Sequence, residues 1–139
     1  MEQLAEFAGN HVLMVLALLG SFALVAAFEL RLRAQGVAQI SPADAVKLIN
    51  KSALVVDLRG AEAFGSGHIA NARNLPLAEI EKNPDAVHKN KSKILLTVCD
   101  TGTQSARAAS LLRKAGFANT FSLRGGIKAW QGENLPLAK

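Results

Sequence analysis

The sequence predicts an α/β domain, an open parallel sheet flanked by helices, preceded by one N-terminal transmembrane helix. Two observations carry this prediction. The first is a run of 17 uncharged residues from Val12 to Phe28. The second is a later alternation of short apolar runs with helical patterns, which is typical of a parallel sheet covered on both faces. The expected segments are an N-terminal flank at 1–11, the membrane helix at 12–30, a juxtamembrane linker at 31–36 and the domain at 37–139.

The composition indicates a folded chain without stabilising cross-links. Of 139 residues, 50% are hydrophobic and only 5% aromatic, so the apolar material is mostly Ala, Leu and Val. This excludes a disordered chain and a collagen-like repeat. The single cysteine excludes an intramolecular disulfide and a cysteine-based zinc cluster. His11 and His88 have no ligand spacing, so we expect no metal and no cofactor.

The apolar run has the length and flanks of a membrane anchor. As a helix it spans about 26 Å, close to the ~30 Å hydrocarbon core of a bilayer. A cleaved signal peptide needs a basic start, whereas Glu2 and Glu6 precede this run. The other alternative is a buried core helix. An anchor of this kind offers membrane lipid and a further membrane protein as partners.

The charges that follow the run predict its orientation. All 16 Lys and Arg residues come after it, beginning at Arg31. The positive-inside rule then places the N-terminus outside and the domain in the cytoplasm. We therefore expect a single-pass protein of a bacterial inner membrane.

The domain begins with a strand and a capped helix. Val37–Ile40 has the pattern of a short strand. Ser41 is a suitable N-cap, with Pro42 at the first helical position and Asp44 three residues after the cap. This arrangement predicts a helix that ends at Asn50.

The remaining elements alternate between short apolar runs and amphipathic patterns. Glycine and proline interrupt one stretch between them, which therefore holds at most short helical turns. The predicted elements are strands at 53–58, 93–98 and 120–123, helices at 104–115 and 127–131, and the irregular stretch at 65–76.

Cys99 directly follows the predicted strand 93–98 and precedes a loop and a helix. In open α/β sheets, ligands bind beyond the carboxyl ends of the strands. The helix N-terminus supplies unpaired N–H groups and positive potential, which lower a thiol's pKa. Gly102 allows the backbone to curl so that N–H groups point inward. The alternative role for Cys99 is that of a small buried hydrophobe. The expected anion-holding loop consists of Asp100, Thr101, Gly102, Thr103, Gln104 and Ser105.

This loop resembles the active-site loop of the rhodanese family of sulfurtransferases. The shared pattern is Cys99-x-x-Gly102-x-x-Ser105-x-x-Ala108, with Arg107 in the first helical turn. Three further segments are similar to family motifs and occur in the same order. They are VVDLR at 55–59, Phe64 followed by GHIANA at 67–72 and NLP at 74–76, and LRGGIKAW at 123–130. A single domain behind an N-terminal helix resembles a bacterial inner-membrane type.

The resemblance implies the fold and a mechanism. The Cys99 thiolate would take sulfane sulfur from a donor such as thiosulfate, forming a persulfide whose charge the backbone N–H groups of the loop hold. A thiol or a protein cysteine would then accept the sulfur. Because the chain has no second cysteine, that acceptor comes from outside. The alternative is a non-catalytic rhodanese-like module that binds or scaffolds partners at the membrane.

Charged residues near the loop have distinct expected roles. Asp100 is the loop's one charged side chain, and its carboxylate is expected to repel thiosulfate and to oppose a lowered thiol pKa. Arg107 compensates only if it turns back toward the loop. Asp57 and Arg59 are expected to pair and brace the neighbouring loops. His68 is expected to make structural hydrogen bonds rather than to act as a base, since a thiolate held by N–H groups needs none.

Two other functions are disfavoured. A phosphatase loop of the Cys-x5-Arg type has Arg six positions after the cysteine, where this chain has Ser105. The basic run of Lys89, Lys91 and Lys93 has no interleaved aromatic residues. It therefore predicts a solvated surface and no nucleic-acid partner.

Overall fold

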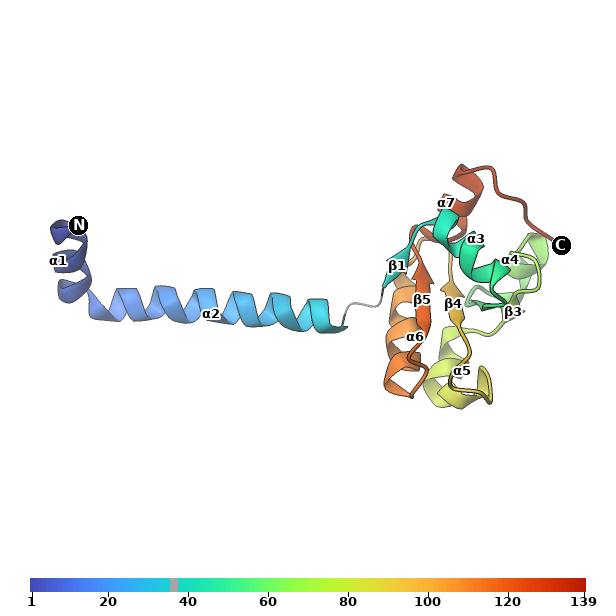
Figure 1. Ribbon diagram of the computed structural model, residues 1–139, viewed down its shortest axis with the longest axis horizontal. Coiled ribbons are helices and arrows are strands. Elements are labelled where there is room, and N and C mark those ends of the chain that lie inside the picture. Colours follow the sequence, from blue (N-terminus) through green and yellow to red (C-terminus); the bar gives the residue numbers. More distant parts are fainter. Residues whose placement is uncertain (36–37) are drawn as a thin grey trace. The chain divides into compact units, whose positions relative to one another are not determined.

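The computed structural model describes residues 1–35 and 38–139 of the chain. These residues belong to two compact units, Met1–Gly36 and Val37–Lys139. The first unit consists of α1 (Glu2–Asn10) and the long helix α2 (Val12–Gln35), which meet at an angle (Figure 1). The second unit is the α/β domain.

Helix α2 contains the expected apolar span. Within the described residues it is the one helix long and apolar enough to cross a membrane, with 19 residues from Val12 to Leu30 at a mean hydropathy of 2.3. No residue of this stretch is buried. By length and composition, α2 is therefore a candidate membrane span.

Helical structure extends into both flanks of this span. The expected flank at 1–11 is helical up to Asn10, and the expected linker at 31–36 is helical up to Gln35. The reason is propensity, since the segment ELRLRAQ at 29–35 consists of good helix formers. The expected helix breaker, Gly36, lies outside the described residues.

The domain is built on a five-stranded sheet in the order β1-β5-β4-β2-β3, and every adjacent pair is parallel. The central strand β4 is buried along its whole length, because neighbouring strands and both helical layers enclose it. The strands are β1 (Gln39–Ile40), β2 (Leu54–Asp57), β3 (Arg73–Asn74), β4 (Leu95–Val98) and β5 (Thr120–Leu123).

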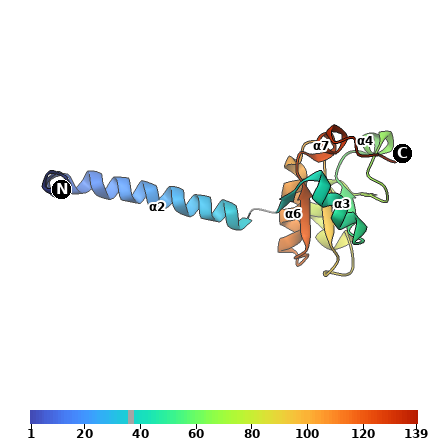
Figure 2. The same ribbon diagram turned by 45° about the horizontal axis from the view of Figure 1, so that its top comes forward.

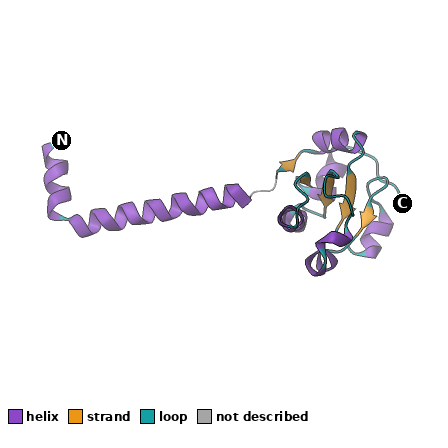
Figure 3. Cartoon of the chain, turned by 60° about the horizontal axis from the view of Figure 1, so that its bottom comes forward, coloured by secondary structure: helices purple, strands orange, loops and turns teal. Residues whose placement is uncertain are grey.

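Helices cover both faces of this sheet (Figures 2 and 3). One buried cluster joins the sheet to α5 and α6, and includes Ile80, Leu112 and Phe117. The other joins it to α3 and α7, and includes Ala45 and Trp130. The helices are α3 (Pro42–Asn50), α4 (Ala61–Ser66), α5 (Leu77–Lys82), the 3-10 turn η1 (Pro84–Ala86), α6 (Thr103–Lys114) and α7 (Gly126–Gly132).

Most elements agree with the sequence-based expectation. The Ser41 hydroxyl caps α3 by accepting a hydrogen bond from the Asp44 amide at 3.2 Å. Val37, the first residue of the expected strand 37–40, lies outside the described residues. The stretch expected to be irregular also contains the edge strand β3. Its two residues pair with Val56 and Asp57, and so short a strand carries no periodic signal in the sequence.

Two glycines at the start of α7 permit a close backbone contact. Gly126 has φ +61°, and a Cβ there would lie 2.3 Å from the Cys99 carbonyl oxygen and 2.5 Å from that of Asp100. No side chain fits against these oxygens. The contact fixes the start of α7 against the loop that follows β4.

We predict that Gly126→Ala destabilises the domain by more than about 2 kcal/mol, because it adds both steric overlap and left-handed backbone strain. Urea unfolding of the full chain in detergent, followed by the fluorescence of the single tryptophan, Trp130, measures this. Gly65→Ala is the control, since a Cβ at that helical position meets nothing within 4 Å. Equal midpoints for the two variants would contradict the prediction.

Candidate active site

Cys99 follows the last residue of β4 and is 4% exposed. Its sulfur lies 3.0 Å from the backbone nitrogen of Gly102 and 3.4 Å from that of Ser105, and both N–H groups donate to it. The loop and the first turn of α6 therefore curl around the sulfur, as the sequence predicted. Cys99 also belongs to the buried cluster that packs against α5 and α6.

Gly102 makes this curl possible. Its φ of +98° lies in the left-handed region, which favours glycine. A Cβ on Gly102 would lie 3.1 Å from the Gly125 nitrogen and 3.2 Å from the Leu123 carbonyl oxygen. The loop after β4 thus packs directly on the loop after β5.

Buried hydroxyls stand behind the sulfur. The Ser105 Oγ lies 3.5 Å from the Cys99 Sγ and 2.9 Å from the Ser122 Oγ, and both serines are fully buried. Thr97 in β4 donates to the Ser105 carbonyl at 2.7 Å, which ties the first turn of α6 to the sheet. The sequence analysis did not identify Thr97 or Ser122. Their signal is a hydroxyl residue within an otherwise apolar core strand.

These contacts shift the pKa of the Cys99 thiol. Burial raises the pKa of Cys99, but the hydrogen bonds from the Ser105 hydroxyl and from the amides of Ser105, Gly102 and Thr101 outweigh it. The net direction is a pKa below the ordinary value of a cysteine. The sequence predicted this direction from the helix N-terminus.

The start of α7 is hydrogen-bonded to the loop that follows β4. The Ile127 amide donates to the Cys99 carbonyl at 2.9 Å, and the Lys128 amide donates to the Asp100 carbonyl at 3.2 Å. These two bonds hold the first part of the loop in place against α7. The site therefore depends on three segments of the chain. They are the loop after β4 with the start of α6, the end of β5 with the loop that follows it, and the start of α7.

A pocket of about 420 Å³ opens beside the sulfur, between the loops after β2 and β4. The expected loop residues divide into two groups. Gly102 and Ser105 are buried around the sulfur. The exposed side chains that line the pocket with Cys99 are those of Asp100, Thr101, Thr103 and Gln104.

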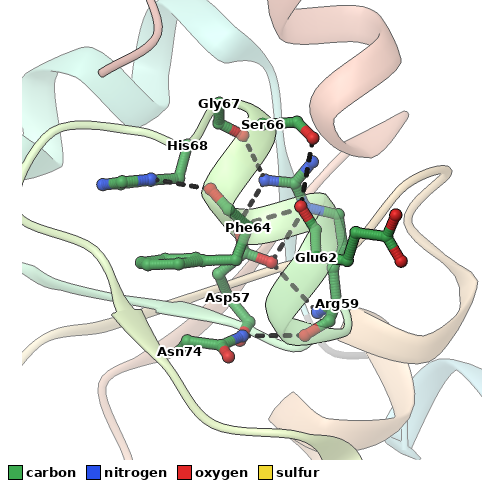
Figure 4. A network of polar contacts seen from close by, with 8 residues as sticks. All are labelled: Asp57, Arg59, Glu62, Phe64, Ser66, Gly67, His68 and Asn74. Carbon is green, nitrogen blue, oxygen red and sulfur yellow. Dashed lines mark hydrogen bonds and ion pairs between the residues drawn. The ribbon is translucent and has the colours of Figure 1, made fainter. Parts of the chain in front are cut away.

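Arg59 lies on the opposite wall of this pocket. Figure 4 shows its guanidinium in a forked pair with Asp57, with Nε to Oδ1 at 3.0 Å and Nη2 to Oδ2 at 2.8 Å. Nη2 also donates to the Gly67 carbonyl at 2.6 Å. The hydrogen bonds that Arg59 donates to Asp57 hold the pKa of Arg59 above its ordinary value despite burial, and the Asp100 charge adds to this.

The Asp57–Arg59 pair is therefore largely buried in the wall of the pocket. Asp57 is 1% exposed and Arg59 8%, so the two charges largely neutralise one another inside the wall. Asn74 ties the same turn together by donating to the carbonyls of Asp57 and Arg59. The sequence analysis expected this pairing, but it did not place Arg59 at the pocket itself.

His68 lies within the scaffold of the neighbouring loop. Its Nδ1 is 2.9 Å from the Phe64 carbonyl, and its ring stacks on that of Phe64 with centroids 3.9 Å apart (Figure 4). Its backbone also exchanges two hydrogen bonds with Ala138. These contacts match the structural hydrogen bonds that the sequence analysis expected of it.

Arg107 does not turn back toward the loop. Its Nη2 lies 2.9 Å from the Glu81 carboxylate on α5, and the side chain is 69% exposed. The side chain thus pairs with α5 rather than with the loop, and the expected contact of Arg107 with an anion stays a prediction. Within residues 1–35 and 38–139, no three metal-ligating side chains come together.

The α/β domain resembles a known protein family over most of its length. The family profile described as "Rhodanese-like domain" matches residues 41–133. The chain belongs to the rhodanese-like family. The described cysteine loop thus belongs to a rhodanese-like domain, with the α/β fold that the sequence predicted.

Among curated relatives, the uncharacterised protein YibN of Escherichia coli is 37% identical over 141 residues, which covers 100% of this chain and 99% of YibN. Thiosulfate sulfurtransferase GlpE of Pseudomonas entomophila is 35% identical and covers 67% of this chain and 84% of GlpE. The likeness to YibN includes the N-terminal unit, and the likeness to GlpE supports a family of sulfurtransferases.

Solved structures of rhodanese-like proteins share the fold. A rhodanese-related protein from Thermoplasma volcanium has a TM-score of 0.66 at 30% identity, covering 73% of this chain and 97% of that one. The polysulfide-sulfur transferase homodimer of Wolinella succinogenes has a TM-score of 0.64 at 25% identity, covering 81% and 88%. The rhodanese-like domain is thus similar to proteins named for sulfur transfer.

We predict that Ser105→Ala raises the pKa of the Cys99 thiol, because the variant loses the side-chain hydrogen bond that lowers it. The rate of alkylation by iodoacetamide as a function of pH measures this pKa. Ser110→Ala, farther along α6, is the control and should leave the profile in place. A Ser105→Ala profile that coincides with the wild type would show that the hydroxyl does not act on the thiolate.

Proposed function

We propose that the protein is a sulfurtransferase or persulfide carrier, in which Cys99 carries sulfane sulfur. The observation that carries this proposal is the set of polar groups around the sulfur: the Gly102 and Ser105 amides, which donate to it, and the Ser105 hydroxyl, whose oxygen lies 3.5 Å away. Such donors stabilise a thiolate before the reaction and an anionic persulfide after it. A cysteine serving only as a core hydrophobe has no need of them.

Loading of the cysteine is a displacement at sulfur. With thiosulfate as donor, the Cys99 thiolate attacks the outer sulfur, a new S–S bond forms, and the S–S bond of thiosulfate breaks. Sulfite leaves with the electron pair of that bond. The total charge of −3 is the same on both sides, and no external oxidant or reductant is needed.

Discharge repeats the displacement on the other side. An incoming thiolate attacks the outer sulfur of the persulfide, and Cys99 leaves as the thiolate that the loop already stabilises. The acceptor is external, because the chain holds one cysteine. The names of the relatives favour thiosulfate or polysulfide as the class of donor.

We further propose that α2 anchors the protein in a bacterial inner membrane as a single pass. The span Val12–Leu30 has the necessary length and hydropathy. All Lys and Arg residues follow it, which favours an external N-terminus and a cytoplasmic domain.

We predict that Cys99→Ser abolishes sulfur loading and leaves the fold intact, since serine is nearly isosteric but cannot carry sulfane sulfur. Intact-mass spectrometry after exposure to thiosulfate or polysulfide should show a gain of about 32 Da on the wild type alone, removable by a reductant. Loading of the Ser variant would overturn the mechanism. If the wild type takes up sulfur from no donor, the domain is a non-catalytic binding module at the membrane.

We predict that a phosphatase reporter fused after Lys139, active only in the periplasm, remains silent, while a cytoplasmic fluorescent reporter at the same position is bright. A fusion with Lys and Arg residues added before Val12 is the control for the charge rule. It should lower the cytoplasmic signal and raise the periplasmic one. A bright periplasmic reporter on the native sequence would refute the orientation. A soluble, shortened chain would identify the span as a cleaved signal.

A further inference from the structure

A second hollow of about 200 Å³ adjoins the pocket that contains the sulfur. Arg59, Ala63 and Asp100 line both hollows, so the two share one wall. The second hollow is lined in addition by the side of α7 that carries Lys128. A ligand larger than a single anion can therefore contact both Cys99 and Lys128.

The charges along this double hollow are balanced. Arg59 is paired with Asp57 inside the wall of the pocket. Asp100 and Lys128 are both exposed. A dianion meets one free cation and one free carboxylate here, which gives it no net attraction. A molecule with one charge of each sign finds a partner for each.

The two residues that carry these exposed charges are joined through their backbones. The Lys128 amide donates to the Asp100 carbonyl at 3.2 Å, and the Ile127 amide donates to that of Cys99 at 2.9 Å. Because Gly126 packs directly against both carbonyls, α7 and the cysteine loop cannot separate without breaking this contact. The backbones of Asp100 and Lys128 are thus fixed at one junction, and Asp100 directly follows Cys99 in the chain.

We propose that this double hollow binds the zwitterionic end of an α-amino-acid thiol, with Asp100 holding its ammonium group and Lys128 its carboxylate. The proposal rests on the proposed function and names the substrate class of the discharge step. The thiolate of the bound amino acid attacks the outer sulfur of the Cys99 persulfide. The sulfur–sulfur bond at Cys99 breaks, the amino acid leaves as its persulfide, and Cys99 returns to the thiolate. The sulfane sulfur is transferred without net oxidation.

This assignment gives Asp100 a positive role. The carboxylate is unfavourable for an anionic sulfur donor, as the sequence already indicated. As the partner of an ammonium group it is favourable, and it lies on the wall common to both hollows. Lys128, which the sequence analysis did not identify, supplies the complementary charge from the C-terminal part of the domain.

The test uses the full chain in detergent, loaded with sulfur, and four thiols that differ in their charged groups. Cysteine carries both an ammonium and a carboxylate, cysteamine only the ammonium, 3-mercaptopropionate only the carboxylate, and 2-mercaptoethanol neither. Loss of the 32 Da adduct gives each discharge rate. For each thiol, the ratio of the variant rate to the wild-type rate cancels the intrinsic reactivity of that thiol.

We expect Asp100→Asn to slow discharge by cysteine and cysteamine about fivefold more than discharge by 2-mercaptoethanol, as for the loss of one partly exposed ion pair. We expect Lys128→Gln to slow cysteine and 3-mercaptopropionate by a similar factor relative to 2-mercaptoethanol. Lys114→Gln, at the far end of α6, is the control for removal of a positive charge and should change all four rates alike.

The comparison of cysteine with 2-mercaptoethanol separates recognition from a general field effect, because their thiolates have the same net charge. Equal rate ratios for these two thiols, in either variant, would overturn the proposal while leaving the sulfurtransferase function in place. A chain that never acquires the 32 Da adduct would instead refute the proposed function. The two failures are therefore distinguishable.

Discussion

The structure around Cys99 depends on a close contact between two backbone segments. The carbonyls of Cys99 and Asp100 point at the start of α7, where Gly126 leaves room and the Ile127 and Lys128 amides donate to them. These bonds fix the first two peptide groups of the loop against α7, and the Gly102 and Ser105 amides that follow donate to the sulfur. The start of α7 is thus part of what positions the loop around Cys99.

The hydrogen bonds around the sulfur lower the pKa of a buried cysteine. Burial alone raises a thiol's pKa and makes it inert. Here the Gly102 and Ser105 amides and a buried hydroxyl lower the pKa of Cys99 by more than burial raises it. The Cys99 sulfur packs in the core and also accepts hydrogen bonds from the loop. The two roles considered for it from the sequence, a buried hydrophobe and a thiolate held by amides, are therefore compatible.

The two arginines nearest the loop are already paired with carboxylates, so neither offers a free positive charge to an anion. The one buried cation on the wall, Arg59, is committed to Asp57 and to the Gly67 carbonyl. Arg107, the cation nearest to the loop in sequence, pairs with Glu81 on α5. The groups left to hold a negative charge beside Cys99 are therefore backbone amides. In the proposed function, the exposed charges at the rim select the acceptor by its charge pattern.

Local patterns in the sequence predicted much of this protein. The apolar span, the capped helix after Ser41, the core strands, Cys99 at a strand end and the pairing of Asp57 with Arg59 all depend on residues close to one another in the chain. Tertiary structure alone decided the rest. It directed Arg107 away from the pocket, brought Ser122 behind Ser105 and placed Lys128 beside Asp100. These outcomes depend on packing between segments distant in the chain, which local propensity and spacing do not encode.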